Sequence, residues 1–506
     1  MPIRQFFPSL RPLHWALLAV LIGCALLPVI AAPIPGLADL PNHIARHHVF
    51  FHHGEGGPLD RYFDVEWRWI GNLGVDLPVL GLMRWMDAES ATRIVVACIA
   101  PLMVLALLAL SRAAHGRISA SAILAMPVIY HHAYMYGFVN YSLSVALGLL
   151  LFALWLARPL EGWRGALLYM LLSLAVWTAH MGGWSIMCVA AGFAELVRLR
   201  SPRDIVGAAR RLWPLATPIV PLLLWRGEPT GAPLYIWTDQ NIFWAKILNF
   251  LTVMKGWSRE ADLAMTGAIG LLALLALFWA GRRRLDPRLA AAGVGVCLMA
   301  TLMPTTMLGS WGADFRVAPA GVILLLLSIS PAADPRRERL VFAAGLLLFV
   351  VRSVGIAASW HRASAVLERR LDTMLEAVPQ GSRMGFIAVQ SDCDYPWVLN
   401  PDRKLPGLAI ARRDVFTNTM FKVDGADLMT IRDPRDRAVW YDLSEDVLPL
   451  CPANAIDYPG LRQRTEEMAR DRFDRIWIWG APADRIPIPP GYRLLRASGE
   501  DVMIGR

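Results

Sequence analysis

The sequence predicts a mainly α-helical, polytopic membrane protein with a small C-terminal α/β domain outside the membrane. Three observations lead to this fold class. Hydrophobic residues make up 56% of the 506 residues and charged residues only 18%, whereas about a quarter of a soluble domain is charged. Apolar runs of about 20 residues, the length that crosses a bilayer, recur along the chain up to Trp360. Beyond Trp360 the composition becomes polar, and helix-like and strand-like patterns follow one another.

About eleven apolar runs have the length and composition of a membrane span. The first run is long for a cleaved signal peptide, so we interpret it as a retained helix. The runs lie near 14–34, 91–111, 118–135, 138–157, 164–181, 183–198, 212–226, 262–281, 288–307, 316–330 and 340–357.

Arginine-rich loops alternate with these spans and predict their orientation. The short loops at 112–117, 158–164, 198–211, 282–288 and 336–339 carry Arg and little else. By the positive-inside rule they are cytoplasmic, as is the N-terminus, and an odd number of spans places the C-terminus outside. The net charge of +9 therefore reflects topology, and we expect no nucleic-acid partner. We assign residues 1–359 to a membrane domain with a large first outer loop at 35–90, and residues 360–506 to the outer domain.

The outer domain opens with an amphipathic helix, ASAVLERRLDTMLEAVP, which Gly381 ends. MGFIAV and FDRIWIWG have the composition of buried strands. The last residues predict a hairpin closed by Ser498-Gly499-Glu500. Cys393 and Cys451 lie in this polar region and could form a disulfide in an oxidising compartment.

The first outer loop begins with PGLADLPNHIARHHVFFHH, which places Asp39 where the chain leaves the first span. Ionisable groups at such a position are functional candidates, and Asp39 could act as a general base with His43 beside it. The alternative is a helix N-cap followed by Pro41. Further along the loop, Asp64, Glu66 and Asp76 are candidates for a second acid, or simply a solvated turn beside interfacial Trp67 and Trp69.

The histidines of this stretch are spaced as metal ligands can be. His43 and His47, and His48 and His52, are i,i+4 pairs that would share a helix face. There is no HExxH motif, and no third ligand is fixed by the sequence. We therefore assign no metal site. His43 and His47 are the candidates if a divalent metal takes part.

Cations and aromatic residues gather in the other outer loops. Arg316, after Asp314 at the start of a span, could bind phosphate in a bidentate manner, or it could be an interfacial anchor or an ion pair with Asp314. Other cations beside tryptophans are further candidates or snorkelling side chains: Arg226, Lys246, Lys255 and Arg259. A further outer turn could line a sugar or phosphate site, or belong to an aromatic belt, through His131, His132, Tyr134, Tyr136 and Asn140.

Together these features resemble the GT-C superfamily of membrane glycosyltransferases. The resemblance covers the whole architecture, with short motifs: AD-x-PNH around Asp39, GADFR around Arg316, and the tail FDRIWIWG…GYRLLRASGEDVMIGR. It implies transfer of a sugar from a polyprenyl-phosphate carrier to a glycan, lipid or protein acceptor outside the cytoplasm. Leu40 stands where protein O-mannosyltransferases have a second acid, and the WWD signature of oligosaccharyltransferases is missing, so no subfamily is assigned.

Carried onto this chain, the resemblance implies an inverting displacement with Asp39 as base. It further implies the bacterial inner membrane, a periplasmic C-terminal domain and contact with membrane lipids. No cofactor is assigned. Site roles follow as expectations: catalysis by Asp39, Glu66 and His43; donor phosphate by Arg316, Lys255, Arg226, His131 and His132; acceptor or sugar by Asp64, Trp67, Tyr136, Asn140 and Asp314.

Three other readings stay open. A transporter or flippase for a lipid-linked sugar is disfavoured by the few charges at mid-membrane and by the lack of a repeat between the two halves. A membrane O-acyltransferase would need an intramembrane His near the cytoplasm, and the only candidate, His180, lies toward the outside. The third reading is a non-catalytic assembly partner.

Overall fold

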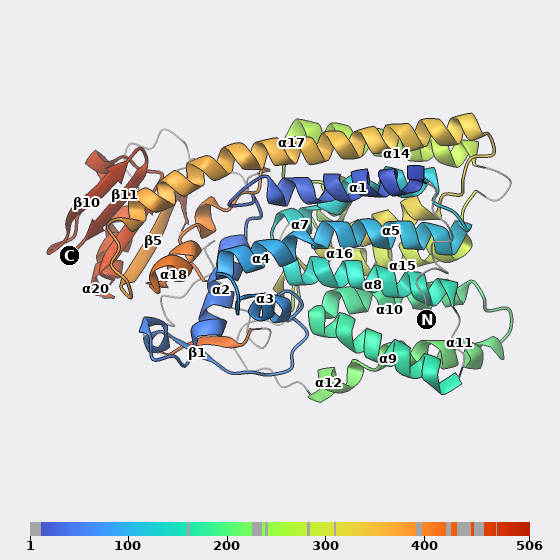
Figure 1. Cartoon of the computed structure of the whole chain (residues 1–506), viewed down its shortest axis with the longest axis horizontal. Helices are drawn as coiled ribbons and strands as arrows, with labels where there is room; N and C mark the ends of the chain where they lie inside the picture. Colours follow the sequence, from blue (N-terminus) through green and yellow to red (C-terminus); the bar gives the residue numbers. More distant parts are fainter. Residues whose placement is uncertain are drawn as a thin grey trace.

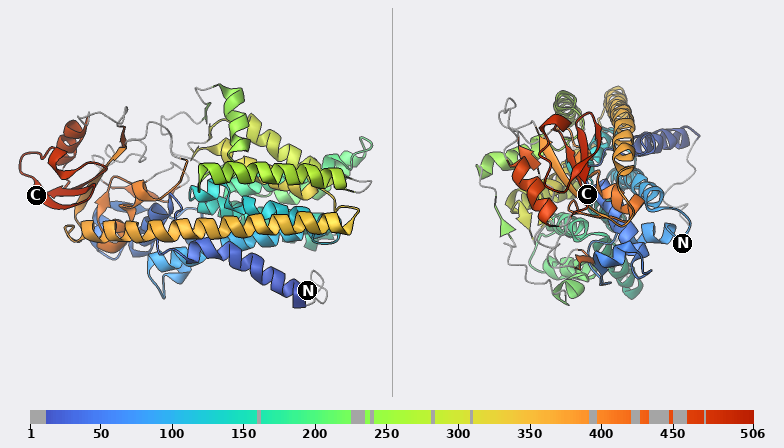
Figure 2. Two further views of the ribbon diagram at one scale, coloured as in Figure 1. Left: turned by 90° about the horizontal axis from the view of Figure 1, so that it is seen from above. Right: turned by 90° about the vertical axis from the view of Figure 1, so that its left-hand side faces the viewer.

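The computed structural model describes residues 12–158, 162–224, 235–237, 241–280, 284–307, 310–390, 397–420, 427–432, 447–449, 460–471 and 473–506. Its helices form an elongated bundle at one end of the molecule, and a mixed β-sheet lies at the other end (Figure 1). One long helix, α17 (Pro335–Leu375), runs along both parts (Figures 1 and 2). We call the end of the bundle that faces the sheet the domain end.

The first part of the chain leaves the bundle after one helix and returns to it through the segment 35–90. Its elements are α1 (Pro12–Ile30), α2 (Leu40–His52), η2 (Pro58–Arg61), β1 (Phe63–Val65), α3 (Asp76–Leu82), α4 (Ala88–Ala97) and α5 (Ile99–His115). The central part of the bundle follows as α6 (Ala120–Ala125), η3 (Met126–Tyr130), α7 (His132–Met135), α8 (Val139–Ala157), α9 (Gly162–Ala179), α10 (Met181–Leu196), α11 (Asp204–Leu212), η4 (Trp213–Ala216) and α12 (Ile219–Leu224).

The bundle is completed by a second group of helices and by three short strands. These elements are β2 (Tyr235–Ile236), α13 (Ile242–Leu251), α14 (Arg259–Trp279), α15 (Pro287–Leu302), β3 (Thr306–Met307), β4 (Ser310–Trp311) and α16 (Ala313–Ser328), with α17 after them. The strands form a small antiparallel sheet in the order β2-β3-β4.

Every predicted span overlaps a helical segment of the bundle. Among the described residues, four helices are long and apolar enough to cross a membrane by length and composition: 88–115, 139–157, 259–279 and 335–375. The figure of about eleven spans stays a prediction. Large apolar side chains are exposed on the outside of the bundle, among them Leu171, Leu271, Leu274, Phe278 and Leu347. Such a surface suits lipid rather than water as its surroundings.

The C-terminal region contains a small α/β layer, as the sequence predicts. Its elements are β5 (Arg383–Gln390), η5 (Asp402–Lys404), α18 (Gly407–Arg413), β6 (Phe416–Thr417), β7 (Met429–Ile431), β8 (Val447–Pro449), α20 (Leu461–Arg470), β9 (Arg475–Trp479), η6 (Ala483–Arg485), β10 (Arg493–Ser498) and β11 (Asp501–Gly505). The sheet order is β10-β11-β9-β5-β6, with β8 also pairing β5. β5 pairs with β6, β8 and β9 in parallel, whereas β9-β11 and β10-β11 are antiparallel.

The predicted strands and hairpin of this region are present. MGFIAV lies in β5, RIWIW forms β9, and the hairpin β10-β11 turns at Gly499. Gly499 has a φ of +60°, a left-handed conformation that glycine adopts at no steric cost. The apolar strands β9 and β11 are buried at the centre of the layer, which explains their near-continuous hydrophobic composition.

The first long loop packs against the C-terminal region. β1 pairs with β7 in an antiparallel fashion, with Phe63 opposite Ile431. The Tyr62 hydroxyl donates to the Gly381 carbonyl at 2.7 Å. α18 also packs on α2, the helix that follows Asp39. Segments more than 300 residues apart in sequence therefore build one surface at the domain end.

The boundary predicted at 359/360 falls inside α17, which continues without a break to Leu375. The helix buries Val341 and Phe349 along the bundle and Leu367 and Leu371 beside the C-terminal region. Trp360 lies so close to the chain after α1 that a Cβ on Gly36 would come within 2.3 Å of the indole nitrogen. The boundary itself stays a prediction.

Candidate active site

Asp39 lies at the domain end, directly before α2, and is 6% exposed. Its backbone has φ −88° and ψ −3°, and its side chain makes no capping hydrogen bond to α2. A conventional N-cap has an extended backbone and accepts from the second or third helical N–H. Asp39 therefore occupies the N-cap position, but its carboxylate is directed to other partners.

Lys404 of η5 is the cation that meets this carboxylate. Its Nζ lies 3.6 Å from Asp39 Oδ1, and the two side chains are 12% and 8% exposed. Lys404 belongs to the C-terminal region and lies 365 positions after Asp39 in the sequence. Nothing in PDRKLPG distinguishes this lysine from an ordinary surface residue, so the sequence analysis missed it.

The segment 136–138 packs against the backbone of Asp39. The Asp39 backbone N–H donates to the Tyr136 carbonyl at 3.0 Å. Gly137 has a φ of +96°, and a Cβ there would lie 2.7 Å from the Asp39 nitrogen. Only glycine tolerates both that backbone conformation and that close approach. His43, one turn into α2, hydrogen-bonds to the backbone of Gly137.

Arg316, at the start of α16, lies on the same segment. Its guanidinium carbon is 3.6 Å from the centre of the Phe138 ring. One terminal nitrogen donates to Ser310 Oγ at 3.0 Å and the other to the Trp311 carbonyl at 2.5 Å. Within the described residues its buried Nε has no hydrogen-bond partner. Arg316 is close enough to Asp39 for the two charges to interact, so the structure brings together the two residues on which the sequence analysis relied most.

Aromatic rings surround this arginine. Tyr136 stacks on Phe138 at 4.7 Å and lies 5.7 Å from Trp311. His132 stacks on Phe315 at 4.5 Å, and its buried Nε2 has no hydrogen-bond partner among the described residues. Tyr136 and His132 thus border the Arg316 site, whereas His131 Nδ1 accepts from the Tyr134 N–H and caps α7.

Lys255 lies in the short turn between α13 and α14, close enough to His132 for their charges to interact. Its Nζ is 5.6 Å from the centre of the Trp397 ring, and burial lowers the pKa of its ammonium group. The turn is held by Asp262, which accepts from the backbone N–H groups of Gly256 and Trp257 at 3.1 Å.

A buried ion pair locks this turn to α17. Arg352 NH1 lies 2.6 Å from Asp262 Oδ1. Its other terminal nitrogen donates to the carbonyls of Tyr130 and Met254 at 2.7 and 2.8 Å. Arg352 was not among the predicted site residues, although a lone arginine within a predicted span is a signal of this kind.

Asp76 and Asn140 lie in a buried ion cluster that supports α2. Arg46 NH2 is 2.8 Å and His47 Nε2 3.3 Å from Asp76 Oδ1. Asn140 Nδ2 donates to Asp76 Oδ2 at 2.8 Å, and Asn140 Oδ1 accepts from the Val75 N–H at 2.6 Å. Burial alone would raise the pKa of Asp76, but the charge of Arg46 and the His47 hydrogen bond outweigh it and hold that pKa well below its usual range.

Asp314 pairs with a cation other than Arg316. Lys246 Nζ lies 2.6 Å from Asp314 Oδ2, and Asn249 Nδ2 donates to the same oxygen at 2.9 Å. The pairing of Arg316 with Asp314, one of the alternatives for that arginine, is absent from the described ion pairs. Asp314 therefore leaves Arg316 available to a ligand.

Three residues expected to take part lie at the surface of the first loop. Asp64 in β1 is 3.6 Å from both His53 and Arg432. Glu66 is exposed, with Arg68 at 3.8 Å, and the exposed Trp67 packs against Phe50. They do not contact Asp39 in any described interaction, and their roles stay predictions.

Other predictions fall outside the described residues, namely Arg226 and the pair Cys393 and Cys451. Within the described ranges no three His, Cys, Asp or Glu side chains converge as a metal site requires. His47, one of the metal candidates, contacts Asp76 and places its Nδ1 2.8 Å from Thr92 Oγ1.

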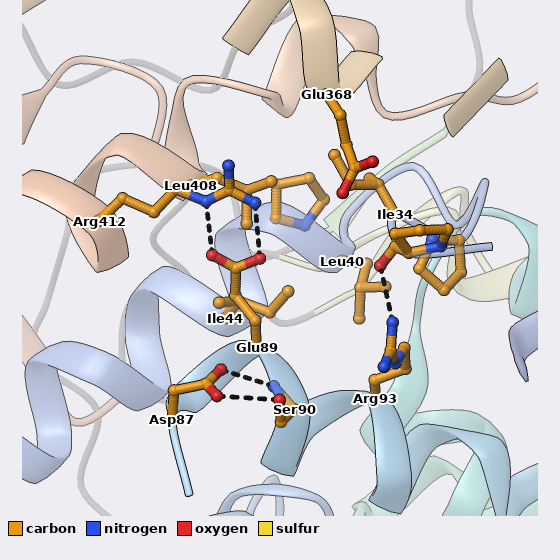
Figure 3. A pocket seen from close by; sticks show the side chains of 13 residues that line it. Ile34, Leu40, Ile44, Asp87, Glu89, Ser90, Arg93, Glu368, Leu408 and Arg412 are labelled. Carbon is orange, nitrogen blue, oxygen red and sulfur yellow. Dashed lines mark hydrogen bonds and ion pairs between the residues drawn. The ribbon is translucent and has the colours of Figure 1, made fainter. Parts of the chain in front are cut away.

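A crevice of about 290 Å³ lies behind the first turn of α2. Figure 3 shows its walls: Arg412 of α18 meets Glu89 of α4 across it, and Leu40 and Ile44 line one side. Both guanidinium–carboxylate contacts are short, at 2.7 and 2.8 Å. Asp39 is not among the lining residues, so the crevice marks the junction between the C-terminal region and the bundle.

No protein-family model and no curated protein matches this sequence, but solved structures do. The apo crystal structure of ArnT from Cupriavidus metallidurans gives a TM-score of 0.52 at 10% identity, over 97% of this chain and 98% of ArnT. The mycobacterial arabinofuranosyltransferase AftD gives 0.50 at 15% identity, over 98% of this chain and 40% of AftD. ArnT bound to undecaprenyl phosphate gives 0.48 at 9% identity, over 98% of each chain. The first two matches show that this chain has the fold of ArnT and of part of AftD, in line with the fold that the resemblance predicts.

Proposed function

We propose that this chain, which has the GT-C fold, is a membrane glycosyltransferase that moves a sugar from a polyprenyl-phosphate donor to an acceptor hydroxyl. One observation carries the proposal: the backbone of Asp39 and the guanidinium of Arg316 contact the same short segment, 136–138, at the domain end, and the two side-chain charges are close enough to interact. A base and a phosphate-binding cation beside one segment are the two groups that such a displacement needs.

The chemistry assigns one role to each group. Asp39 takes the proton of the acceptor hydroxyl as that oxygen attacks the anomeric carbon. The bond from this carbon to the phosphate oxygen breaks, and its electron pair leaves with the phosphate. A single displacement from the opposite face inverts the anomeric configuration. Arg316 stabilises the charge that develops on the leaving phosphate, with Lys255 as a second cation.

Several contacts favour phosphate as the ligand of Arg316. The phenyl ring of Phe138 and two neutral acceptors hold the guanidinium, and among the described residues no carboxylate forms an ion-pair contact with it. Its buried Nε still offers a hydrogen bond. Arginine in this state suits a bidentate, fully charged anion. The lipid tail of the donor would run along the apolar outer faces of the helices.

Sugar and acceptor binding fit the remaining groups. Tyr136 and Trp311 present aromatic surface beside Arg316, on which a sugar ring can pack. Burial lowers the pKa of His43 well below its usual value, and the charge of Arg46 acts in the same direction. His43 is therefore neutral and orients the Gly137 turn. Asp64 and Trp67 remain proposed acceptor contacts and Glu66 a proposed catalytic residue, with the domain end in the periplasm of a bacterial inner membrane.

The test is transfer of radiolabelled sugar from a panel of polyprenyl-phosphate sugars by the purified protein. Asp39→Asn should abolish transfer while the protein still folds, as a cooperative thermal unfolding transition would show. Asp334→Asn is the matched control, because Asp334 also precedes a helix but caps α17 far along the chain. The anomeric configuration of the product should be inverted relative to the donor, and a lane with chelator tests metal dependence.

Two results would contradict the proposal in different ways. Equal transfer by the wild type and Asp39→Asn would remove Asp39 as the base and return attention to Glu66 and Asp64. No transfer from any donor by folded wild-type protein would refute glycosyl transfer itself. Movement of a lipid-linked sugar across reconstituted vesicles would then support the transport reading.

A further inference from the structure

We infer that Lys404 is a positioning residue of this site, so that the C-terminal region supplies part of the catalytic machinery rather than only covering it. The inference rests on the proposed function of Asp39. It goes beyond that function because it assigns a role to a residue outside the bundle. It also makes the docking of the C-terminal region a condition for activity.

The contact is an ion pair that is largely hidden from water. Lys404 Nζ and Asp39 Oδ1 are 3.6 Å apart, with 12% and 8% of the side chains exposed. At this distance an ammonium group favours the ionised form of a carboxylate. Asp39 accepts no hydrogen bond from α2, the helix that it precedes. Lys404 therefore adds to the charge of Arg316, which also acts on Asp39, and helps to place a carboxylate that its own helix does not cap.

Contacts with α17 fix the position of η5, the short helix that carries Lys404. Asp402, two residues earlier in η5, lies 2.5 Å from Arg370 NH1. Arg370 is also paired with Asp501 of β11 at 2.7 Å. Because α17 continues into the bundle, the position of η5 is fixed relative to the helices that carry the rest of the site.

Contacts with α2 and α4 fix the position of α18, the helix that follows Lys404. Gly407 packs so closely against this helix that a Cβ there would lie 2.5 Å from Asn42 Oδ1. Asn42 Nδ2 donates to the Thr419 carbonyl at 2.7 Å. The Arg412–Glu89 pair then fastens α18 to α4 across the crevice in Figure 3. Docking of α18 thus sets the distance from Lys404 to Asp39.

The kinetic test compares the pH dependence of kcat/KM for the wild type, Lys404→Met and Lys404→Arg. Loss of the cation should shift the acid limb of the Lys404→Met profile to higher pH by about one unit. It should also lower kcat/KM at neutral pH. Lys404→Arg should restore the limb, because the charge returns. Arg403→Gln, the neighbour on η5, is the control and should overlay the wild type. A Lys404→Met profile that overlays the wild type would overturn the inference.

A second measurement does not depend on activity. Thermal unfolding of Lys404→Met, Asp39→Asn and the double variant forms a cycle. Two residues in contact give non-additive effects, so the double variant should lose less Tm than the sum of the single losses. Additive losses would overturn the inference whatever the transfer assay shows. If wild-type protein transfers no sugar but the cycle is non-additive, the proposed function fails while the contact between the two parts stands.

Discussion

Replacing Asp76 with asparagine should destabilise the protein, because it removes the carboxylate that forms an ion pair with the buried guanidinium of Arg46 at 2.8 Å. The two side chains are 1% and 3% exposed, so water cannot replace the lost partner. Removing one member of a buried ion pair costs about 3–5 kcal/mol. A cooperative unit of 506 residues has an unfolding entropy of about 1 kcal/mol/K, from about 2.1 cal/mol/K per residue. The Tm should therefore fall by about 3–5 °C.

The assay is thermal unfolding in detergent, followed by tryptophan fluorescence, with Arg46→Met as the second substitution. Replacing both members of a buried pair with uncharged groups is often nearly neutral. Asp76→Asn combined with Arg46→Met should therefore unfold closer to the wild type than Asp76→Asn alone. A drop of less than about 1 °C in the single variant, or a larger drop in the double variant, would refute the buried pair as the support of α2.

Three further predictions concern the site. Arg316→Met should reduce kcat by about a hundredfold or more, the usual cost of a lost charge-stabilising donor. Arg316→Lys should recover only part of the lost kcat, since a point charge lacks the bidentate geometry of a guanidinium. Steady-state transfer rates check both variants. Gly137→Ala should cost about 1–3 kcal/mol of backbone strain and displace Asp39, because its Cβ would lie 2.7 Å from the Asp39 nitrogen; both Tm and transfer should fall. His43 has a pKa below the unfolded value of 6.5, chiefly through burial, so the unfolded state binds the extra proton and stability is lost as pH falls below 6.5. The drop in Tm between about pH 7.5 and 5 should therefore be smaller in His43→Gln.

The sequence was sufficient to single out those candidate residues whose signal lies in their local position. Asp39 and Arg316 each stand at the edge of an apolar run, where the cost of an ionisable group signals a role. Their common contact with segment 136–138 depends on the tertiary structure and has no signal in the sequence. Helical periodicity and strand composition similarly predicted β5, β9 and the final hairpin, because these patterns are local.

Residues that act through distant contacts could not be assigned in this way. Asp76 and Asn140 belong to the cluster with Arg46, and no spacing in the sequence shows that they meet. Lys404 has no local signal at all. Arg352 was within reach of sequence reasoning, since it interrupts an apolar run and Asp262 opens another, and the two neutralise each other in the structure.

The unbroken course of α17 has a practical consequence for anyone who wants the C-terminal region by itself. Its 41 residues make a rod about 60 Å long at 1.5 Å per residue. A cut at residue 359 would leave only the C-terminal part of α17. Its buried apolar residues, Leu367 and Leu371, would still need a packing partner. The cut would also take away β1, the partner strand of β7. The C-terminal region therefore depends on its contacts with the first loop as well as on its own sheet. We expect it to be soluble and folded only when it is expressed together with that loop.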